Sequence, residues 1–254
     1  MDKLSALNRY SIRDLTIIPI TAADNLVIAC DSIGGIGPKE MDQVQVSGYV
    51  VGRFLARVPL MELIAFNATP IAVVDTLSVE WNPTGKDIYR GIEEELETAG
   101  LGSLISNGST EENMTTNQTG AGITIIGRIS KNKMKKRILQ KGDELVLVGL
   151  PKVGAEVKLE DEETVSINTV RELAENSHIK EIIPVGSKGI IHEIKEIINC
   201  QPNKLSYSVT NQKGINLEQS GGPATSILIV TSANYITELK KIVKEPVNLI
   251  GCLT

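Results

Sequence analysis

Two aspartates placed in or after apolar, strand-like runs are the residues of this sequence best suited to bind a metal ion. Asp31 directly follows the run 25–30, which is typical of a buried strand, and Asp75 interrupts a second apolar run at 70–80. A carboxylate in such surroundings is costly to bury unless it pairs with a cation or binds a metal. Asp31 and Asp75 are therefore candidate metal ligands.

A polar segment ahead of the β-forming run 123–126 offers a second kind of chemistry. We expect this segment to be a loop, and it combines backbone N–H groups, hydroxyls and the carboxylates of Glu111 and Glu112. Such a mixture suits a cation that carries phosphate oxygens, because carboxylates bind the metal while N–H and hydroxyl groups bind the anion. A solvated turn is the competing interpretation. The candidate phosphate-binding residues are Asn107, Gly108, Ser109 and Thr110.

A glycine-rich segment follows Asp31. Gly34 and Gly35 permit a close approach of the backbone to a ligand, and Lys39, a few residues later, could offset negative charge that develops in a reaction. The spacing matches neither the phosphate-binding P-loop nor the dinucleotide fingerprint. The segment is therefore a candidate ligand loop without an assigned nucleotide motif.

Glu62 falls in the last turn of a helix that we expect over residues 44–66, bent or restarted at Pro59. The helix dipole disfavours a carboxylate at this end. A bound cation or a basic partner such as Arg57 would compensate, and a plain surface acid is the alternative. Glu62 is thus a third candidate metal ligand.

Strand-like and helix-like segments must position these residues, and they alternate along the whole chain. This alternation predicts α/β or α+β layers, with a domain boundary near residue 140 that separates domains 1–140 and 141–254. Helix 86–99 should place Glu93, Glu94, Glu95 and Glu97 on a solvated face. In the second half we expect helices at 164–176, 190–198 and 233–243, and strands at 145–149, 179–185, 226–230 and 247–253.

Two further segments have polar features with competing interpretations. Residues 186–189, between glycines at a helix start, form either an anion cradle or an ordinary turn. The basic run 131–137 is either a solvated connector or a contact for an acidic partner.

Composition excludes several classes of function. A net charge of −5, a pI near 5.3 and 3% aromatic residues argue against a nucleic-acid partner. The absence of an apolar run of about 18 residues, or of a signal-type segment, predicts a cytoplasmic protein without a membrane partner. Cys30, Cys200 and Cys252 are too widely spaced for a zinc motif, and we expect each to be a small buried residue.

The order and spacing of several short motifs resemble the aminoimidazole ribonucleotide synthetase-like (PurM-like) ATP-binding superfamily. Within it, Arg13–Thr16 and Asn107–Asn113 look most similar to the α-ribazole kinase and thiamine-monophosphate kinase branch. The resemblance covers most of the chain. It rests on segments 29–34, 59–70, 74–75, 107–110, 141–149 and 220–224.

The resemblance implies an α+β domain whose sheet pairs with that of a second subunit to form a barrel in a homodimer, followed by a C-terminal α/β domain. It further implies that ATP and Mg²⁺ bind in a cleft, with Asp31, Glu62 and Asp75 as metal ligands. We expect catalytic roles for Asp31 and Lys39. Transfer of phosphate to a small nucleoside-like acceptor, α-ribazole, is the implied reaction. A thiamine-monophosphate kinase-like enzyme, an aminoimidazole ribonucleotide synthetase-like enzyme and a non-catalytic dimeric nucleotide-binding protein are the alternatives.

Three positions depart from the family pattern. Ser109 stands where the family has an acid, so Glu111 or Glu112 would have to replace that ligand. Asn67 stands where the family prefers glycine. The short N-terminus also has no clear counterpart, before Asp24, of the family's acidic phosphate loop.

Overall fold

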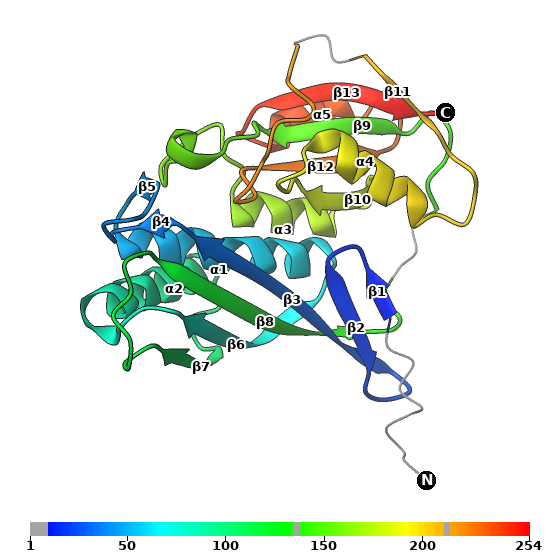
Figure 1. Cartoon of the computed structure of the whole chain (residues 1–254). Helices are drawn as coiled ribbons and strands as arrows, with labels where there is room; N and C mark the ends of the chain where they lie inside the picture. Colours follow the sequence, from blue (N-terminus) through cyan, green and yellow to red (C-terminus); the bar gives the residue numbers. More distant parts are fainter. Residues whose placement is uncertain (1–9, 135–137, 211–213) are drawn as a thin grey trace. The chain divides into compact units, whose positions relative to one another are not determined.

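Each half of the chain builds its own sheet and its own helices (Figure 1). The structure is a computed structural model that describes residues 10–134, 138–210 and 214–254. The chain divides into two units, Met1–Met134 and Lys135–Thr254. The boundary expected near residue 140 lies within the second of these units.

The sheet of the first unit has six strands in the order β1-β2-β3-β8-β6-β7. All neighbouring strands are antiparallel except β6 and β7, which run parallel. The sheet is open, and one copy of the chain forms no closed barrel in the part that the structure describes. The bounds are Tyr10–Ile12 for β1, Leu15–Pro19 for β2, Asp24–Gly34 for β3, Thr69–Leu77 for β6, Ile105–Thr110 for β7 and Gly120–Ser130 for β8. A separate parallel pair joins β4 (Ile36–Gly37) to β5 (Val44–Gln45).

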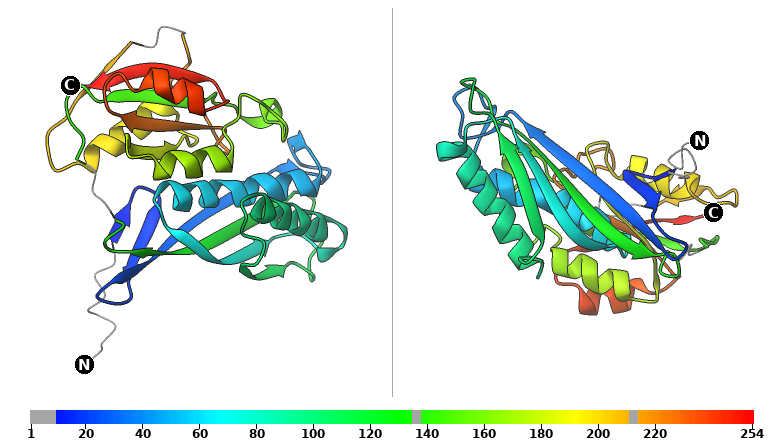
Figure 2. Two further views of the ribbon diagram at one scale, coloured as in Figure 1. Left: turned by 180° about the vertical axis from the view of Figure 1, so that it is seen from behind. Right: turned by 90° about the horizontal axis from the view of Figure 1, so that it is seen from below.

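Helices α1 (Gly48–Ala65) and α2 (Lys86–Thr98) cover one face of this sheet (Figure 2). The Ser47 side chain caps α1, and the helix continues through Pro59 without a break. A Cβ at Gly52 or Gly91 would overlap the backbone of the other helix, so these two glycines allow the helices to cross at close range. A π-helical turn, η2 (Trp81–Gly85), leads into α2.

The sequence pattern suggested that Glu95 lies on a solvated face. In the structure it is buried between the two helices. Glu95 is 3% exposed, and its Oε2 accepts a hydrogen bond from Arg53 Nε at 2.6 Å. Arg57 Nη1 lies 3.6 Å from Oε1. The pattern was misleading because the helix-helix contact brings two arginines to this position, which offset the cost of burying the carboxylate.

The second unit has a five-stranded sheet in the order β10-β12-β9-β13-β11. Its strands are antiparallel throughout, so the unit is better described as α+β than as the expected α/β, because alternation along the chain does not fix strand direction. The strands are β9 (Glu144–Gly149), β10 (Ile179–Pro184), β11 (Tyr207–Val209), β12 (Ser226–Thr231) and β13 (Val247–Leu253). The helices are α3 (Ile167–Glu175), α4 (Ile190–Asn199) and α5 (Ile236–Ile242), with a short 3-10 turn, η3 (Gly154–Glu156).

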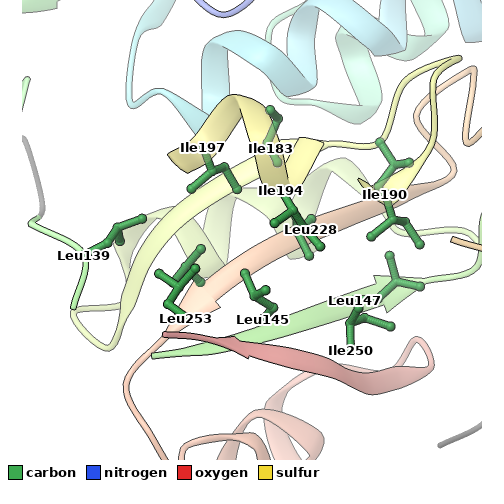
Figure 3. Packing of buried hydrophobic residues seen from close by; sticks show 12 residues of the cluster. Leu139, Leu145, Leu147, Ile183, Ile190, Ile194, Ile197, Leu228, Ile250 and Leu253 are labelled. Atoms are coloured by element: carbon green, nitrogen blue, oxygen red, sulfur yellow. The ribbon is translucent and has the colours of Figure 1, made fainter. Parts of the chain in front are cut away.

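One hydrophobic cluster of the second unit lies between α4 and the sheet (Figure 3). Ile190, Ile194 and Ile197 recur at helical spacing along α4, and all are buried against strand residues such as Leu147 and Leu228. This cluster is built almost entirely from Ile, Leu and Val, in keeping with an aromatic content of only 3%.

The cysteine prediction was wrong. Cys30 and Cys200 are exposed, and Cys252 is half-buried. Cys30 lies on β3, where alternate residues point away from the helices, so its apolar surroundings in sequence did not imply burial on both faces.

In the described residues, no helix combines the length and the apolar character that crossing a bilayer requires.

Candidate metal and nucleotide site

Sheet register places Asp31 and Asp75 in one row across three strands. Asp31 of β3 pairs with Ile123 of β8, and Ile123 pairs with Asp75 of β6. Directly paired residues point to the same face of a sheet, so the two carboxylates share the face on which the buried Ile123 side chain lies. Two strand spacings of about 4.8 Å separate their backbones. The structure thus brings together two acids that are distant in sequence.

Burial perturbs both carboxylates. Asp75 is 3% exposed, and burial raises the pKa of its carboxyl group to about 6. Burial also raises the pKa of the half-buried Asp31 to about 6, although a hydrogen bond from the backbone of Ser32 acts in the opposite direction. Among the described residues, Asp75 Oδ2 has no hydrogen-bond partner. A cation at this point would satisfy that oxygen and stabilise the ionised form.

Gly108 gives the Asp75 side chain the room it occupies. The two residues are paired between the parallel strands β6 and β7, and a Cβ at position 108 would overlap both carboxylate oxygens of Asp75. The sequence indicated a loop here, but Asn107, Gly108, Ser109 and Thr110 belong to strand β7. Because β7 is at the edge of the sheet, its outer N–H and C=O groups face away from the ladder. The edge of a strand, rather than a loop, therefore offers donors beside Asp75.

Glu62 is not brought into this row. It is buried on α1, next to Leu63, whose side chain would lie 3.1 Å from a Cβ at Gly127. Gly127 is four residues from Ile123 on β8, which corresponds to about 13 Å along the strand. The described residues contain no group of three His, Cys, Asp or Glu side chains placed to hold a metal. Two of the three predicted ligands thus lie in one row, on either side of Ile123, and Glu62 lies outside that row.

The predicted glycine loop is in part a continuation of a strand. β3 extends through Gly34, and the chain turns at Gly35, whose φ of +71° is favoured by glycine. The Lys39 side chain forms an ion pair with Glu80. The Lys39 backbone N–H donates to Asp42 Oδ2 at 2.8 Å. Lys39 is therefore held firmly in place, with its charge already balanced by a carboxylate.

Lys39 and Glu80 lie in the wall of a cavity of about 1070 Å³ that the sequence did not reveal. Its lining also includes Trp81, Tyr89 and Arg90, and it adjoins the start of helices α1 and α2. Residues 81–85 include Asn, Pro and Gly, which are typical of an ordinary turn. The single tryptophan of a chain so poor in aromatic residues, placed among turn-forming residues, was the available signal in the sequence.

Glu112 joins the cavity to the strand that contains Gly108. Its Oε1 accepts hydrogen bonds from the backbone N–H of Trp81, at 2.7 Å, and from Thr110 Oγ1, at 2.9 Å. Glu111 instead accepts from the backbone N–H groups of residues 113 and 114. Glu111 and Glu112, the two acids that could have replaced the family's acid at position 109, thus both bind backbone or side-chain groups of the chain itself. This segment therefore adds no third acid to the pair Asp31 and Asp75.

The possible anion cradle at 186–189 contains a carboxylate of the chain itself. Glu193, in the first turn of α4, accepts a hydrogen bond from Gly186 N at 3.2 Å. The side chain of Glu193 is buried. A negative charge already occupies the position that an anion would take, which favours the interpretation as a turn.

Comparison with solved structures relates the fold to known enzymes. Thiamine-monophosphate kinase from Stenotrophomonas maltophilia superposes with a TM-score of 0.64 at 13% identity, over 95% of this chain and 86% of the kinase. The kinase from Aquifex aeolicus gives 0.61 at 14% identity, over 98% and 89% of the two chains. The chain has the fold of thiamine-monophosphate kinase.

A longer protein contains the same fold. Phosphoribosylformylglycinamidine synthase II from Thermotoga maritima matches with a TM-score of 0.61 at 14% identity, and the alignment covers 95% of this chain but only 37% of the synthase. Structures of the T. maritima protein PurL contain ATP or AMPPCP, and one of the A. aeolicus kinase contains AMPPCP and TMP. No family model and no curated protein sequence matches the chain. These neighbours agree with the resemblance to the PurM-like superfamily at the level of the fold.

Proposed function

We propose that the chain is an ATP-dependent phosphotransferase that uses Mg²⁺ and acts on a hydroxyl group of a small nucleoside-like acceptor. Buried Asp75, with one carboxylate oxygen lacking a hydrogen-bond partner among the described residues, is the observation that carries the proposal. It lies in the same row as Asp31, in a fold shared with enzymes crystallised with ATP or its analogues.

A pair of acids is enough for this type of metal site. Mg²⁺ is usually bound by one or two carboxylates together with phosphate oxygens and water, and rarely by a cage made of protein alone. The lack of a third acid beside Asp31 and Asp75 in the described residues is therefore compatible with a metal that arrives with the nucleotide. When bound, the metal would neutralise phosphate charge in the transfer.

The chain's own residues would then bind the cation and the phosphate groups and position them for the transfer. Asp31 and Asp75 hold the cation, and Gly108 leaves the space in which the Asp75 carboxylate sits. The outer backbone N–H groups along β7, from Asn107 to Thr110, and the Ser109 hydroxyl offer donors to phosphate oxygens, whereas the Thr110 hydroxyl already donates to Glu112 Oε1. Phosphoryl transfer needs little covalent help from a protein, so this binding and alignment accounts for most of what an enzyme of this kind must do.

For the acceptor we propose α-ribazole, the assignment that the motifs Arg13–Thr16 and Asn107–Asn113 favour. Thiamine monophosphate is the alternative that the neighbouring folds suggest. An assay that supplies each compound with ATP and Mg²⁺ separates the two. Formation of ADP with one acceptor and not with the other would assign the substrate.

We also propose a homodimer formed through the face of the first sheet that α1 and α2 leave uncovered. Register places Ile28, Ile126, Ala72 and Ile105 in one row on this face. Ile105 is 75% exposed, and Val74 in the adjacent row is exposed as well. A sheet face with this much apolar surface is stabilised when a second copy covers it.

Calorimetric titration of the full chain with ATP, with and without Mg²⁺, tests the metal-dependent nucleotide site. We expect Mg²⁺ to increase the affinity for ATP and the variant Asp75→Asn to lose that increase. Asp14→Asn, which changes an exposed aspartate of the same unit, is the matched control and should behave as the unchanged protein. Equal ATP affinity with and without Mg²⁺ would contradict the proposal.

A further inference from the structure

The cavity at the start of α2 has an aromatic wall. Trp81 and Tyr89 both line it, with ring centroids 5.9 Å apart and an angle of 57° between the ring planes. Trp81 is 38% exposed, and its backbone N–H donates a hydrogen bond to Glu112 Oε1. An aromatic ring that is open to a cavity is suited to stacking against another flat ring.

The charges in the wall cancel. Lys39 pairs with Glu80, and Arg90 lies 2.8 Å from Asp87. The remaining charged residues of the lining are one lysine and one glutamate. The basic groups are already neutralised by neighbouring acids, so they would attract a triphosphate only weakly. The binding of an uncharged ligand does not depend on such an attraction. The cavity therefore favours a neutral ring over a highly charged nucleotide tail.

The carboxylate of Glu80 provides hydrogen-bond acceptors in the wall of the cavity. Its Oε1 accepts from Thr84 Oγ1 at 2.6 Å, and its Oε2 accepts from Lys39. Two carboxylate oxygens accept about four hydrogen bonds, so each retains capacity for a hydroxyl group of a ligand. The side chain is 29% exposed, so a ligand can reach it.

The cavity is close to the acid pair. Glu112 joins Trp81 to Thr110, and Thr110 is two residues from Gly108 along β7, a distance of about 7 Å. Gly108 is the residue paired with Asp75. A ring in the cavity could therefore carry a sugar whose hydroxyl extends toward the row of acids.

We propose that this cavity binds the flat, uncharged heteroaromatic ring of the hydroxyl-bearing acceptor, with Trp81 and Tyr89 as the aromatic wall and Glu80 as a hydroxyl acceptor. The identification of the ligand as the acceptor rests on the proposed function. The cavity volume of about 1070 Å³ lies just above the range found for small-molecule sites, about 300–1,000 Å³, and leaves room for a nucleoside.

The chain contains a single tryptophan, so its fluorescence reports directly on the cavity. We expect titration with α-ribazole, without ATP or Mg²⁺, to change Trp81 fluorescence in a saturable manner, and ribose alone to leave it unchanged. Tyr89→Ala should weaken binding at least about tenfold, because a stacking ring is lost. Tyr89→Phe keeps the ring and should restore binding. Tyr10→Ala changes an exposed tyrosine on β1 and serves as the control.

The outcomes distinguish this proposal from the proposed function. Saturable α-ribazole binding that survives in Asp75→Asn, without phosphate transfer by the unchanged protein, would support the ring site and overturn the kinase assignment. Phosphate transfer to α-ribazole with an unchanged KM in Tyr89→Ala and no fluorescence change would overturn the ring site and leave the kinase. The absence of any saturable change in Trp81 fluorescence together with the absence of transfer would overturn both.

Discussion

The carboxylate of Asp75 occupies the space that a side chain at Gly108 would fill. The two residues are paired between parallel strands, and a Cβ at position 108 would overlap both carboxylate oxygens. The requirement for glycine here is therefore one of space, because no positive φ is recorded at this position. This relationship links a residue that the sequence assigned to metal binding with one that it assigned to phosphate binding.

Gly108→Ala should consequently displace the Asp75 carboxylate and weaken Mg²⁺-dependent ATP binding. We expect a loss of at least about tenfold in affinity, equivalent to about 1.4 kcal/mol, measured by calorimetry. Gly222→Ala is a matched control, because a Cβ there would meet only ordinary contacts. Unchanged affinity in Gly108→Ala would show that the position of Asp75 does not matter for the nucleotide.

The pKa of about 6 at Asp75 predicts a pH-dependent stability of the free protein. Because burial raises this pKa above the ordinary value of 3.8, the carboxyl group's contribution to stability is fully present below about pH 3.8 and is lost as the pH rises through about 6. Between pH 5 and 7 the free energy of unfolding should therefore fall in the unchanged protein relative to Asp75→Asn, whose amide does not ionise.

Denaturant unfolding at several pH values, without nucleotide or Mg²⁺, measures this difference. Asp14→Asn should follow the pH profile of the unchanged protein, since Asp14 is exposed. Parallel profiles for the unchanged protein and Asp75→Asn would mean that burial does not raise the pKa of this carboxyl group.

The buried ion pairs of Glu95 should stabilise the crossing of α1 and α2. Removing the carboxylate in Glu95→Ala leaves Arg53 and Arg57 without this acid, and losing one member of a buried pair typically costs about 3–5 kcal/mol. Urea unfolding measures the change in free energy. Glu94→Ala, at the neighbouring exposed position, should change it by less than about 0.5 kcal/mol. Similar effects of the two substitutions would contradict a structural role for the ion pairs.

Local pattern was sufficient to predict the helices and most strands, because apolar spacing and strong β-formers report directly on one element at a time. It failed where contacts between elements distant in sequence determine the structure. Glu95 looks solvated along α2, and only the crossing with α1 shows it to be buried. The segment 107–110 has turn-forming residues, yet pairing with β6 makes it a strand.

The candidate site shows the same division. Asp31 and Asp75 were identified from the cost of placing a carboxylate in or beside an apolar run, and register then places them in one row. Glu62 was identified by a different criterion, the unfavourable helix dipole at the end of α1, and its position on that helix keeps it away from the row. The aromatic cavity had no counterpart in the pattern, because Trp81 and Tyr89 meet only through the turn before α2.

Ile105 provides the sharpest test of the proposed dimer. It is 75% exposed on the edge strand β7, in the row of the uncovered sheet face that also contains Ile28 and Ile126. Ile105→Asp would place a charge without a partner in the proposed interface, so we expect the dissociation constant of the dimer to rise at least about 100-fold in sedimentation equilibrium. Ile242→Asp alters a residue of α5 that is 50% exposed in the second unit, and should leave the dimer intact. A monomeric unchanged protein, or equal dimerisation of both variants, would contradict an interface on this face.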